Sequence, residues 1–243
     1  MLCGTQLRQE YDGSVIIQDV NLSVRAGTVT VLMGKSGCGK STLLRTLSLV
    51  DPPKEGSISI GEQQIFPFSN NSSYSPWPDI TVVFQQFFLW PHLTIRRNLL
   101  LPAQLRQKST TRASDLCRAL ALEELLDRFP NQLSVGQRQR AALAKALLLQ
   151  PKFLLLDEIT SAQDIQHVAL MLKVLRDAIN EGIGVLVVSH HFGFTRQLLL
   201  KSPGSQIVFM ESGTVVESGG VECLNHPASN ELRTYIQLSS SLE

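Results

Sequence analysis

The chain has 243 residues, of which 43% are hydrophobic and 18% are charged, so it falls within the range of folded globular proteins and outside that of disordered ones. This length favours one core with an added lobe. The formal net charge of +1 gives no support to nucleic acid or to an anionic membrane surface as a binding partner.

The first part of the chain predicts β structure, then a buried strand, a loop and a helix. Residues 15–24 alternate apolar and polar side chains, as in a half-buried strand, and the pattern ends at the turn Ala26-Gly27. The apolar run 28–33 predicts a buried strand, and leucines at helical spacing follow residue 42. Between them the sequence is GKSGCGKST, which has the form G-x-x-x-x-G-K-[ST].

The loop at residues 34–42 has the chemistry of a phosphate-binding site. Its glycines let successive backbone N–H groups turn inward at the positive end of a helix. Lys40 adds a charge near the outer phosphates, and Ser41 offers a hydroxyl to Mg²⁺. A chance glycine-rich turn is the alternative, which the flanking strand and helix disfavour. The expected phosphate contacts are Gly34, Lys35, Ser36, Gly37, Cys38, Gly39, Lys40, Ser41 and Thr42.

The middle of the chain predicts two more strands and then a helical lobe. Residues 56–61 alternate like a half-buried strand, and residues 80–84 form a short β-branched run. The polar stretch 66–78 between them predicts a surface loop. From residue 94 to residue 150 the apolar spacing is helical, with no strand candidate, so we expect a separate helical lobe there.

The last third of the chain returns to alternating strands and helices. Residues 153–156 and 184–188 are continuous apolar runs, as in buried parallel strands, and a helix is predicted over 165–180 between them. A hairpin is expected over 206–216, followed by two short helices. Alternating strands and helices around a phosphate loop predict an α/β fold.

The buried strand 153–156 ends in two carboxylates, Asp157 and Glu158. A phosphate-loop nucleotide site requires a carboxylate in the Mg²⁺ shell, and Asp157 fits that role. Glu158 points differently and can accept a proton from, or align, the water that attacks the γ-phosphate. Taken without the phosphate loop, the same two residues would equally suit a solvated acidic pair at a strand end.

Two further candidates stand at a strand end and a helix start. His190 follows the strand 184–188, where the ligand crevice of a parallel sheet lies, and we expect a hydrogen bond to the γ-phosphate; a packed histidine is the alternative. Ser134 is expected to cap the helix 138–149, and Gly136 permits close backbone approach. A serine, a glycine and a helix N-terminus also form an anion site, which is useful only if it meets a second chain.

Together these residues resemble the ABC-transporter ATPases over nearly the whole chain. GKSGCGKST is similar to their Walker A loop, FLLLDE to the Walker B strand, LSVGQ to the signature, VVFQ to the Q-loop and VSH to the switch-histidine segment. Ser161 to Asp164 resemble the D-loop, and Tyr11 matches an aromatic position that stacks on adenine.

The resemblance implies one P-loop NTPase domain over residues 1–243, with a mainly parallel core sheet and an N-terminal antiparallel β subdomain. Residues 1–93 and 151–243 would form the catalytic core, and 94–150 an inserted helical signature lobe. It also implies hydrolysis of ATP with Mg²⁺. The catalytic residues implied are Glu158, His190, Lys40 and Gln85. The other ATP contacts implied are Tyr11, Gln85, Ser134, Gly136, Gln137 and Asp164, and the Mg²⁺ contacts are Ser41, Gln85 and Asp157.

The partners implied are a second copy of the chain and a set of membrane proteins. The family's head-to-tail dimer holds two ATP molecules between the Walker A loop of one subunit and the signature of the other. Closing and opening of this dimer would drive transmembrane permease subunits, which in turn bind a solute-binding protein. The resemblance does not imply a nucleic acid partner. The segment FQQFFLWPHLTIRRNLLL resembles polar amino acid import ATPases. Its residues Phe87, Phe88, Leu89 and Trp90 are a candidate docking patch, with core packing as the alternative.

The location that follows is the cytoplasmic, inner face of the cell membrane, with the chain attached through its partner. The four cysteines are scattered without C-x-x-C spacing, which favours a reducing compartment. No apolar run approaches the ~20 residues of a membrane span, and the N-terminal segment lacks the apolar region of a signal peptide.

Three positions depart from the family pattern, and they leave alternatives open. Val135 replaces a glycine of the signature, Ile159 replaces a proline after Glu158, and Gln163 replaces a leucine of the D-loop. Because valine is strained at positive φ, Val135 puts the signature geometry and turnover in question. A regulatory protein with impaired hydrolysis is therefore one alternative. An ATPase energising transport of a lipid, peptide or ion, and a soluble ABC protein of DNA repair or translation, are the others.

Overall fold

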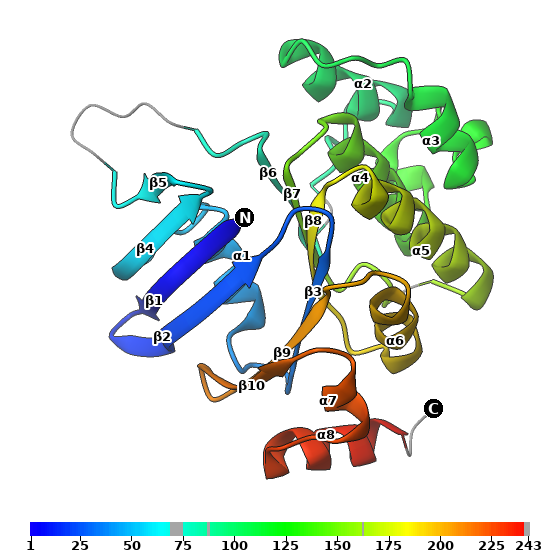
Figure 1. The fold of residues 1–243 in the computed structure, drawn as a ribbon. Coiled ribbons are helices and arrows are strands. Elements are labelled where there is room, and N and C mark those ends of the chain that lie inside the picture. The colour runs from blue at the N-terminus through cyan, green and yellow to red at the C-terminus, as the bar shows by residue number, and fades with distance from the viewer. Residues whose placement is uncertain (69–74, 87, 162, 241–243) are drawn as a thin grey trace.

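The structure, a computed structural model, describes residues 1–68, 75–86, 88–161 and 163–240. Within these residues the chain forms two β-sheets and a group of helices (Figure 1). The larger sheet has the strand order β10-β9-β3-β8-β7-β6, and the smaller one has the order β2-β1-β4-β5. The strands of the larger sheet are β3 (Val29–Gly34), β6 (Ile80–Val83), β7 (Phe153–Asp157), β8 (Gly184–Val188), β9 (Gln206–Glu211) and β10 (Thr214–Gly219).

The larger sheet is parallel from β9 to β6, and only β10 joins it in antiparallel pairing. All residues of β3, β7 and β8 are buried, which explains why these segments are continuous apolar runs. The α/β prediction is therefore confirmed. So is the hairpin, although its first strand, β9, also pairs with β3 in the core.

The smaller sheet is antiparallel, as the resemblance implied. Its strands are β1 (Leu2–Tyr11), β2 (Ser14–Val24), β4 (Glu55–Ile60) and β5 (Gln63–Phe66). No strand was predicted over residues 2–11, where β1 lies. Its apolar residues Leu2 and Leu7 are fully buried, while the positions between them are largely polar. The predicted surface loop at 66–78 lies partly outside the described residues.

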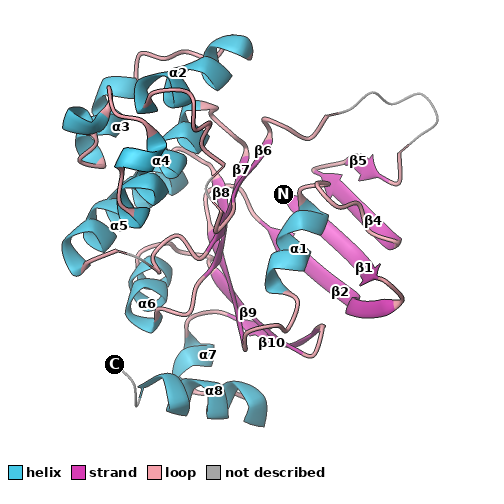
Figure 2. Ribbon diagram, turned by 180° about the vertical axis from the view of Figure 1, so that it is seen from behind, coloured by secondary structure: helices cyan, strands magenta, loops and turns pink. Residues whose placement is uncertain are grey.

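Two hydrophobic cores lie on the two faces of the larger sheet. One contains Leu43, Leu44 and Leu47 of α1 (Lys40–Leu47) together with the inner face of the smaller sheet. The other lies under α4 (Val135–Leu148), α5 (Ile165–Asn180) and α6 (Phe192–Leu200). Figure 2 shows the consequence: α1 and the smaller sheet lie on one side of the larger sheet, and α4, α5 and α6 on the other.

The segment 94–150 is helical throughout its ordered elements, as predicted. These elements are α2 (Ile95–Leu105), α3 (Ala113–Ala119), η1 (Glu123–Leu125), η2 (Pro130–Gln132) and α4. The expected start of α4 at Arg138 was wrong by one turn. Ser134 and Gln137 form a capping box in which each side chain accepts from the other residue's backbone N–H, and this box starts the helix at Val135.

The C-terminal part contains one helix that the sequence analysis did not predict. This is α6, whose Phe194 and Leu198 are buried four residues apart, a spacing that could have indicated it. The two short C-terminal helices were predicted and are α7 (Glu222–Asn225) and α8 (Asn230–Ser240). None of the described helices combines the length and the apolar character needed to cross a lipid bilayer.

Candidate functional site

The phosphate loop lies between β3 and α1 and requires glycine at two positions. Gly34 has φ of 148°, and a Cβ there would lie 2.2 Å from the carbonyl oxygen of Met210 on β9. Gly39 has φ of 103° and precedes the first residue of α1. The ammonium of Lys40 is held inside the loop, because it donates to the carbonyl oxygens of Gly34 at 2.7 Å and Lys35 at 2.8 Å. The loop is thus closed around its own lysine.

A carboxylate and a hydroxyl meet beside this loop. Asp157 ends β7 and is only 5% exposed, and it accepts a hydrogen bond from the hydroxyl of Ser41. Burial raises the pKa of Asp157, while the Ser41 hydrogen bond and the charge of Lys40 act in the opposite direction. Among the described residues no group of three His, Cys, Asp or Glu side chains is placed to hold a metal. One carboxylate with one hydroxyl suits Mg²⁺, which retains water and phosphate oxygens as its other ligands.

Glu158 joins three segments at the open side of the loop. Its backbone has φ of 53°, and its N–H donates to the carbonyl oxygen of Val188 at 3.0 Å, so the left-handed turn is tied to the end of β8. Its carboxylate lies 3.0 Å from Nε2 of His190 and 3.5 Å from the side-chain amide nitrogen of Gln85. Gln85, His190 and Glu158 are therefore brought together, as the sequence analysis expected.

These segments surround a cleft of about 370 Å³. Residues that line it come from β2, the phosphate loop, α1 and the ends of β6 and β7: they are Ile16, Ser36, Gly37, Gly39, Lys40, Ser41, Thr42, Gln85 and Glu158. Ile16 was not predicted. It lies beside Gly39, whose added Cβ would meet the carbonyl oxygen of Ile16 at 3.0 Å.

The signature residues lie apart from this cleft, on α4. Ser134 is the N-cap, its hydroxyl accepts from the N–H of Gln137 at 3.2 Å, and both side chains are exposed or partly exposed. The backbone strain predicted at Val135 was wrong. Position 135 is the first residue of an α-helix and is 44% exposed, so it needs no positive φ and no strain follows from the valine. Ile159, another departure, is a core residue with 1% exposure.

Gln163, the third departure, links the segment after Glu158 to the signature helix. Its amide nitrogen donates to the carbonyl oxygen of Gly136 at 2.8 Å and to the side-chain oxygen of Gln139 at 3.0 Å. Its side-chain oxygen accepts from the buried guanidinium of Arg140 at 3.1 Å. A leucine could make none of these bonds. Part of the signal was in the sequence, because Gln139 and Arg140 are polar residues next to the largely apolar run 141–148 of α4.

Comparison with known proteins decides the family. A family model described as "ABC transporter" matches residues 17–161. The arginine transport ATP-binding protein ArtP of Haemophilus influenzae is 37% identical over 93% of this chain and 95% of its own length. The glutamate transport ATP-binding protein GluA of Corynebacterium efficiens is 34% identical over 97% of this chain and 98% of its own length.

The chain belongs to the ABC transporter family. A solved structure described as a dimeric post-hydrolysis state of the ATP-binding cassette MJ0796, bound to ADP and Pi, aligns with a TM-score of 0.79. It is 28% identical and covers 91% of this chain and 99% of that chain. As a member of the ABC transporter family, the chain is an ATP hydrolase that is coupled to transport.

Two residues that the resemblance to the ABC transporter family assigned to nucleotide binding have other partners in this structure. The hydroxyl of Tyr11, which is 41% exposed, donates to Asp51 at 2.9 Å. Asp164 is the N-cap of α5 and accepts from the N–H of His167 at 2.9 Å, and the bonds from His167 lower the pKa of Asp164. Neither residue lines the cleft beside the phosphate loop, so their predicted contacts with ATP stay predictions.

A second, apolar groove of about 310 Å³ lies where α2 and α4 meet the loop after β6. Phe88 is 60% exposed and Trp90 is 37% exposed at its edge, and Lys145 of α4 lies 4.4 Å from the centre of the Trp90 ring. The exposed rings argue against core packing for these two members of the patch predicted from the ABC transporter resemblance. Phe87 lies outside the described residues. The other aromatic residues that line the groove are Trp77 and Phe84.

Proposed function

We propose that the chain is the ATP-hydrolysing subunit of an ABC importer that takes up a polar amino acid through separate transmembrane subunits. The observation that carries this is the cleft in which Lys40, Gln85 and Glu158 converge, in a chain closely related to transport ATP-binding proteins for arginine and glutamate. The proposal also places the chain at the inner face of the cell membrane, bound to permease subunits that work with a solute-binding protein.

The phosphate loop binds the polyphosphate of ATP. Its backbone N–H groups and the start of α1 supply hydrogen-bond donors, and Lys40 supplies a positive charge. In the described structure the Lys40 ammonium donates hydrogen bonds to two carbonyl oxygens of the loop. These bonds hold the ammonium in place before the phosphates bind. Ser41, Asp157 and Gln85 would hold Mg²⁺, which neutralises charge on the phosphate oxygens when it is bound.

Glu158 orients the attacking water and accepts its proton. Its carboxylate is fixed by the left-handed turn and by the contact with His190, so little reorganisation is needed when the water binds. The Nε2 atom of His190 lies 3.0 Å from the carboxylate of Glu158, which lines the cleft, and from this position we infer that it donates to the γ-phosphate. Gln85 follows Phe84, which lines the apolar groove, so we infer that Gln85 connects this chemistry to the groove.

The signature residues act on a second copy of the chain. Ser134, Gly136 and Gln137 lie at the exposed N-terminus of a helix of 14 residues, where an anion is stabilised. They do not line the cleft of their own chain, so we infer a head-to-tail dimer that brings them over the partner's ATP. The dimeric description of the related MJ0796 cassette supports this arrangement. Val135 lies in a regular helix, so backbone strain at this residue gives no support to an impaired, purely regulatory protein.

The apolar groove beside Phe88 and Trp90 is where we place the permease. Exposed aromatic rings around a groove are typical of a protein interface. The groove is lined by both β6 and α4, so a partner seated there would contact the core and the helical lobe together.

An uptake assay tests the proposal. Cells that depend on this chain should lose uptake of one labelled polar amino acid, from a panel that includes arginine and glutamate, when Glu158→Gln replaces the native chain. The purified variant should bind ATP as the native chain does and hydrolyse it at least about a hundredfold more slowly, because the base is removed.

Two outcomes would contradict the proposal. Unchanged hydrolysis in Glu158→Gln would remove Glu158 from the reaction. Lost hydrolysis with normal uptake of every amino acid in the panel would refute amino acid import while leaving the ATPase assignment in place. Lys173→Gln, on an exposed part of α5, is the control and should behave as the native chain.

A further inference from the structure

The C-terminal helix α8 reaches the candidate active site. Its Leu232 and Tyr235 are buried in the core that lies under α4 to α6, with exposures of 0% and 9%. The Tyr235 ring packs on Phe209 of β9, with 5.4 Å between the ring centres. Figure 1 shows α8 beside the β9 end of the larger sheet, far from α2 and α3. The ring is thus positioned by the sheet that also carries the phosphate loop.

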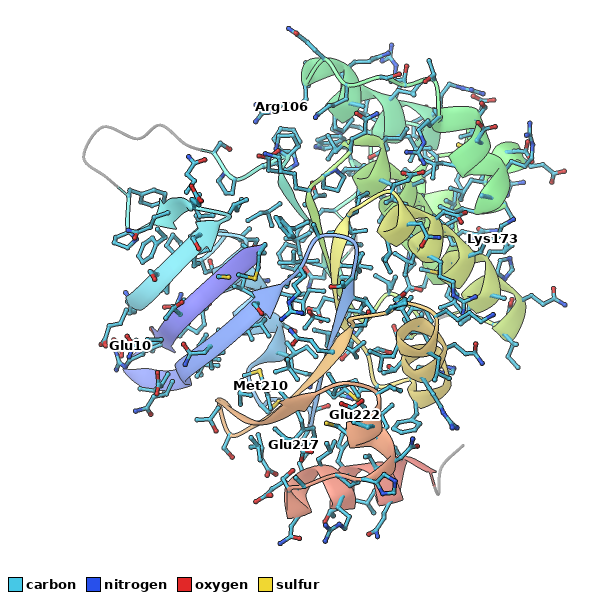
Figure 3. The ribbon with its side chains drawn as sticks, in the orientation of Figure 1. Glu10, Arg106, Lys173, Met210, Glu217 and Glu222 are labelled. Carbon is cyan, nitrogen blue, oxygen red and sulfur yellow. The ribbon has the colours of Figure 1, made fainter. Side chains whose placement is uncertain are left out.

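The start of α8 is also tied to the sheet. The carboxylate of Glu217 on β10 accepts from the backbone N–H groups of Ala228 at 3.0 Å and Ser229 at 2.8 Å. Figure 3 labels Glu217 in the strand next to α7 and α8. A helix that is fixed by the two residues before it and buried in its middle holds its side chains in one place.

The hydroxyl of Tyr235 contacts His190, at 3.0 Å from Nδ1. The other ring nitrogen, Nε2, lies 3.0 Å from the carboxylate of Glu158. A carboxylate only accepts hydrogen bonds, so in the neutral ring the proton is on Nε2 and Nδ1 must accept. Burial raises the pKa of Tyr235, and the nearby Cys38 and Glu158 act in the same direction, so its O–H remains available as a donor.

We propose that Tyr235 is a positioning residue for ATP hydrolysis: it donates to Nδ1 of His190 and thereby holds the ring with Nε2–H directed at Glu158 and the γ-phosphate. The inference rests on the proposed role of His190. It adds the C-terminal helix to the machinery, because α8 then controls the orientation of a group that contacts the reacting phosphate. Tyr235 itself need not touch ATP.

The test compares Tyr235→Phe with the native chain by nitrogen-15 NMR of labelled histidine and by steady-state kinetics. The phenylalanine ring keeps the contact with Phe209 and removes only the hydroxyl. At about pH 8.5, above the ordinary histidine pKa of about 6.5, the Nδ1 resonance of His190 should move downfield because it loses its donor. His190→Gln identifies that resonance by removing it.

The kinetic arm should show a fall in kcat with little change in KM. We expect kcat for ATP to fall roughly three- to tenfold, the range of one neutral hydrogen bond, with KM within about twofold. The matched control is Thr234→Val, the next residue of α8, whose exposed hydroxyl bonds within the helix to the carbonyl oxygen of Asn230 at 2.9 Å. This variant should change neither the resonance nor kcat.

Each remaining outcome overturns the inference. An unmoved Nδ1 resonance shows that the hydrogen bond is absent, whatever happens to kcat. If the Nδ1 resonance shifts in Tyr235→Phe while kcat stays native, the hydrogen bond exists but does not position His190 for hydrolysis. The NMR arm uses nucleotide-free protein, so it decides the hydrogen bond even if His190→Gln were to retain full activity, which would instead refute the proposed role of His190.

Discussion

The cleft beside the phosphate loop and the N-terminus of α4 are both candidate phosphate sites, but they differ in how far one chain completes them. In the cleft, the Lys40 ammonium is held by two carbonyl groups of its own loop, and the Glu158 carboxylate contacts His190 and Gln85 from two other segments of the same chain. At α4, Ser134 and Gln137 satisfy only each other and face outward. A site enclosed by its own chain can be preorganised, whereas an exposed helix start needs a second surface before it can act.

The two regions are nevertheless joined within the chain. Gln163 bonds to Gly136, Gln139 and Arg140, and the segment that carries it begins at Glu158. The hydroxyl of Ser161 also donates to the carbonyl oxygen of Glu158 at 3.1 Å. Movement of α4, the signature helix, should therefore shift the turn at Glu158, the candidate base. This link is the structural basis for treating the two regions as halves of one site.

Lys40→Ala should give the largest effect, because Lys40 is the only positively charged side chain among the described residues that line the cleft. A hydrogen bond to a charged group contributes about 1.5–3 kcal/mol, so ATP affinity should fall roughly 10- to 100-fold in a calorimetric titration. Lys173→Ala removes the same charge from α5, which Figure 3 shows away from the phosphate loop, and should leave affinity unchanged. If Lys40→Ala bound ATP as tightly as the native chain, the cleft would not be a phosphate site that one chain completes by itself.

Gln163→Leu tests the link between the regions by restoring the family's usual residue. The buried Arg140 guanidinium and the Gly136 carbonyl each lose a partner, which should lower the free energy of unfolding by about 1–3 kcal/mol in urea titrations. Gln166→Leu, three residues later at an exposed position in the first turn of α5, is the control and should change stability by less than about 0.5 kcal/mol. Equal stability of the two variants would show that Gln163 links nothing.

Asp157→Asn should have a smaller effect than Gln163→Leu, and it should raise the stability of the folded chain instead of lowering it. Burial raises the pKa of Asp157 above its ordinary 3.8, so ionising it costs folding free energy at neutral pH, and this cost disappears as pH falls through the folded-state pKa. The nucleotide-free variant should melt at a higher temperature than the native chain at pH 7, and this gain should shrink as pH falls through the folded-state pKa of Asp157.

The control for this melting experiment is Asp127→Asn. Arg96 bonds to Asp127 and lowers its pKa, so the same substitution there should give no rise in melting temperature. If Asp157→Asn melted at a lower temperature than the native chain at pH 7, burial of the charged Asp157 carboxylate would not cost folding free energy, and the prediction would be wrong.

The sequence predicted the cleft better than it predicted α4. Motifs such as the phosphate loop and Asp157-Glu158 depend on residues that are local in the chain, and their strand and helix flanks have clear periodicity. The strain assigned to Val135 was wrong because a rule for isolated residues was applied where a capping box places the residue in a helix. Helix α6 was missed because its pattern is short.

Contacts between distant segments could not be predicted from one sequence. Tyr235 lies 45 residues from His190, and only the packing of α8 on β9 brings them together. The partners of Gln163 span 23–27 residues and depend on how α4 and α5 meet. The Tyr11 hydroxyl and Asp164 have partners that the family resemblance gave no reason to expect.

The central claim is that one chain holds half a site, and a mixing experiment tests it most directly. With a non-hydrolysable ATP analogue, neither Lys40→Ala nor Ser134→Arg alone should form dimers in analytical ultracentrifugation, because every composite site would contain one damaged half. An equal mixture should form dimers, since one site then combines the native phosphate loop of one chain with the native signature of the other. A mixture that stays monomeric while the native chain dimerises would contradict the account.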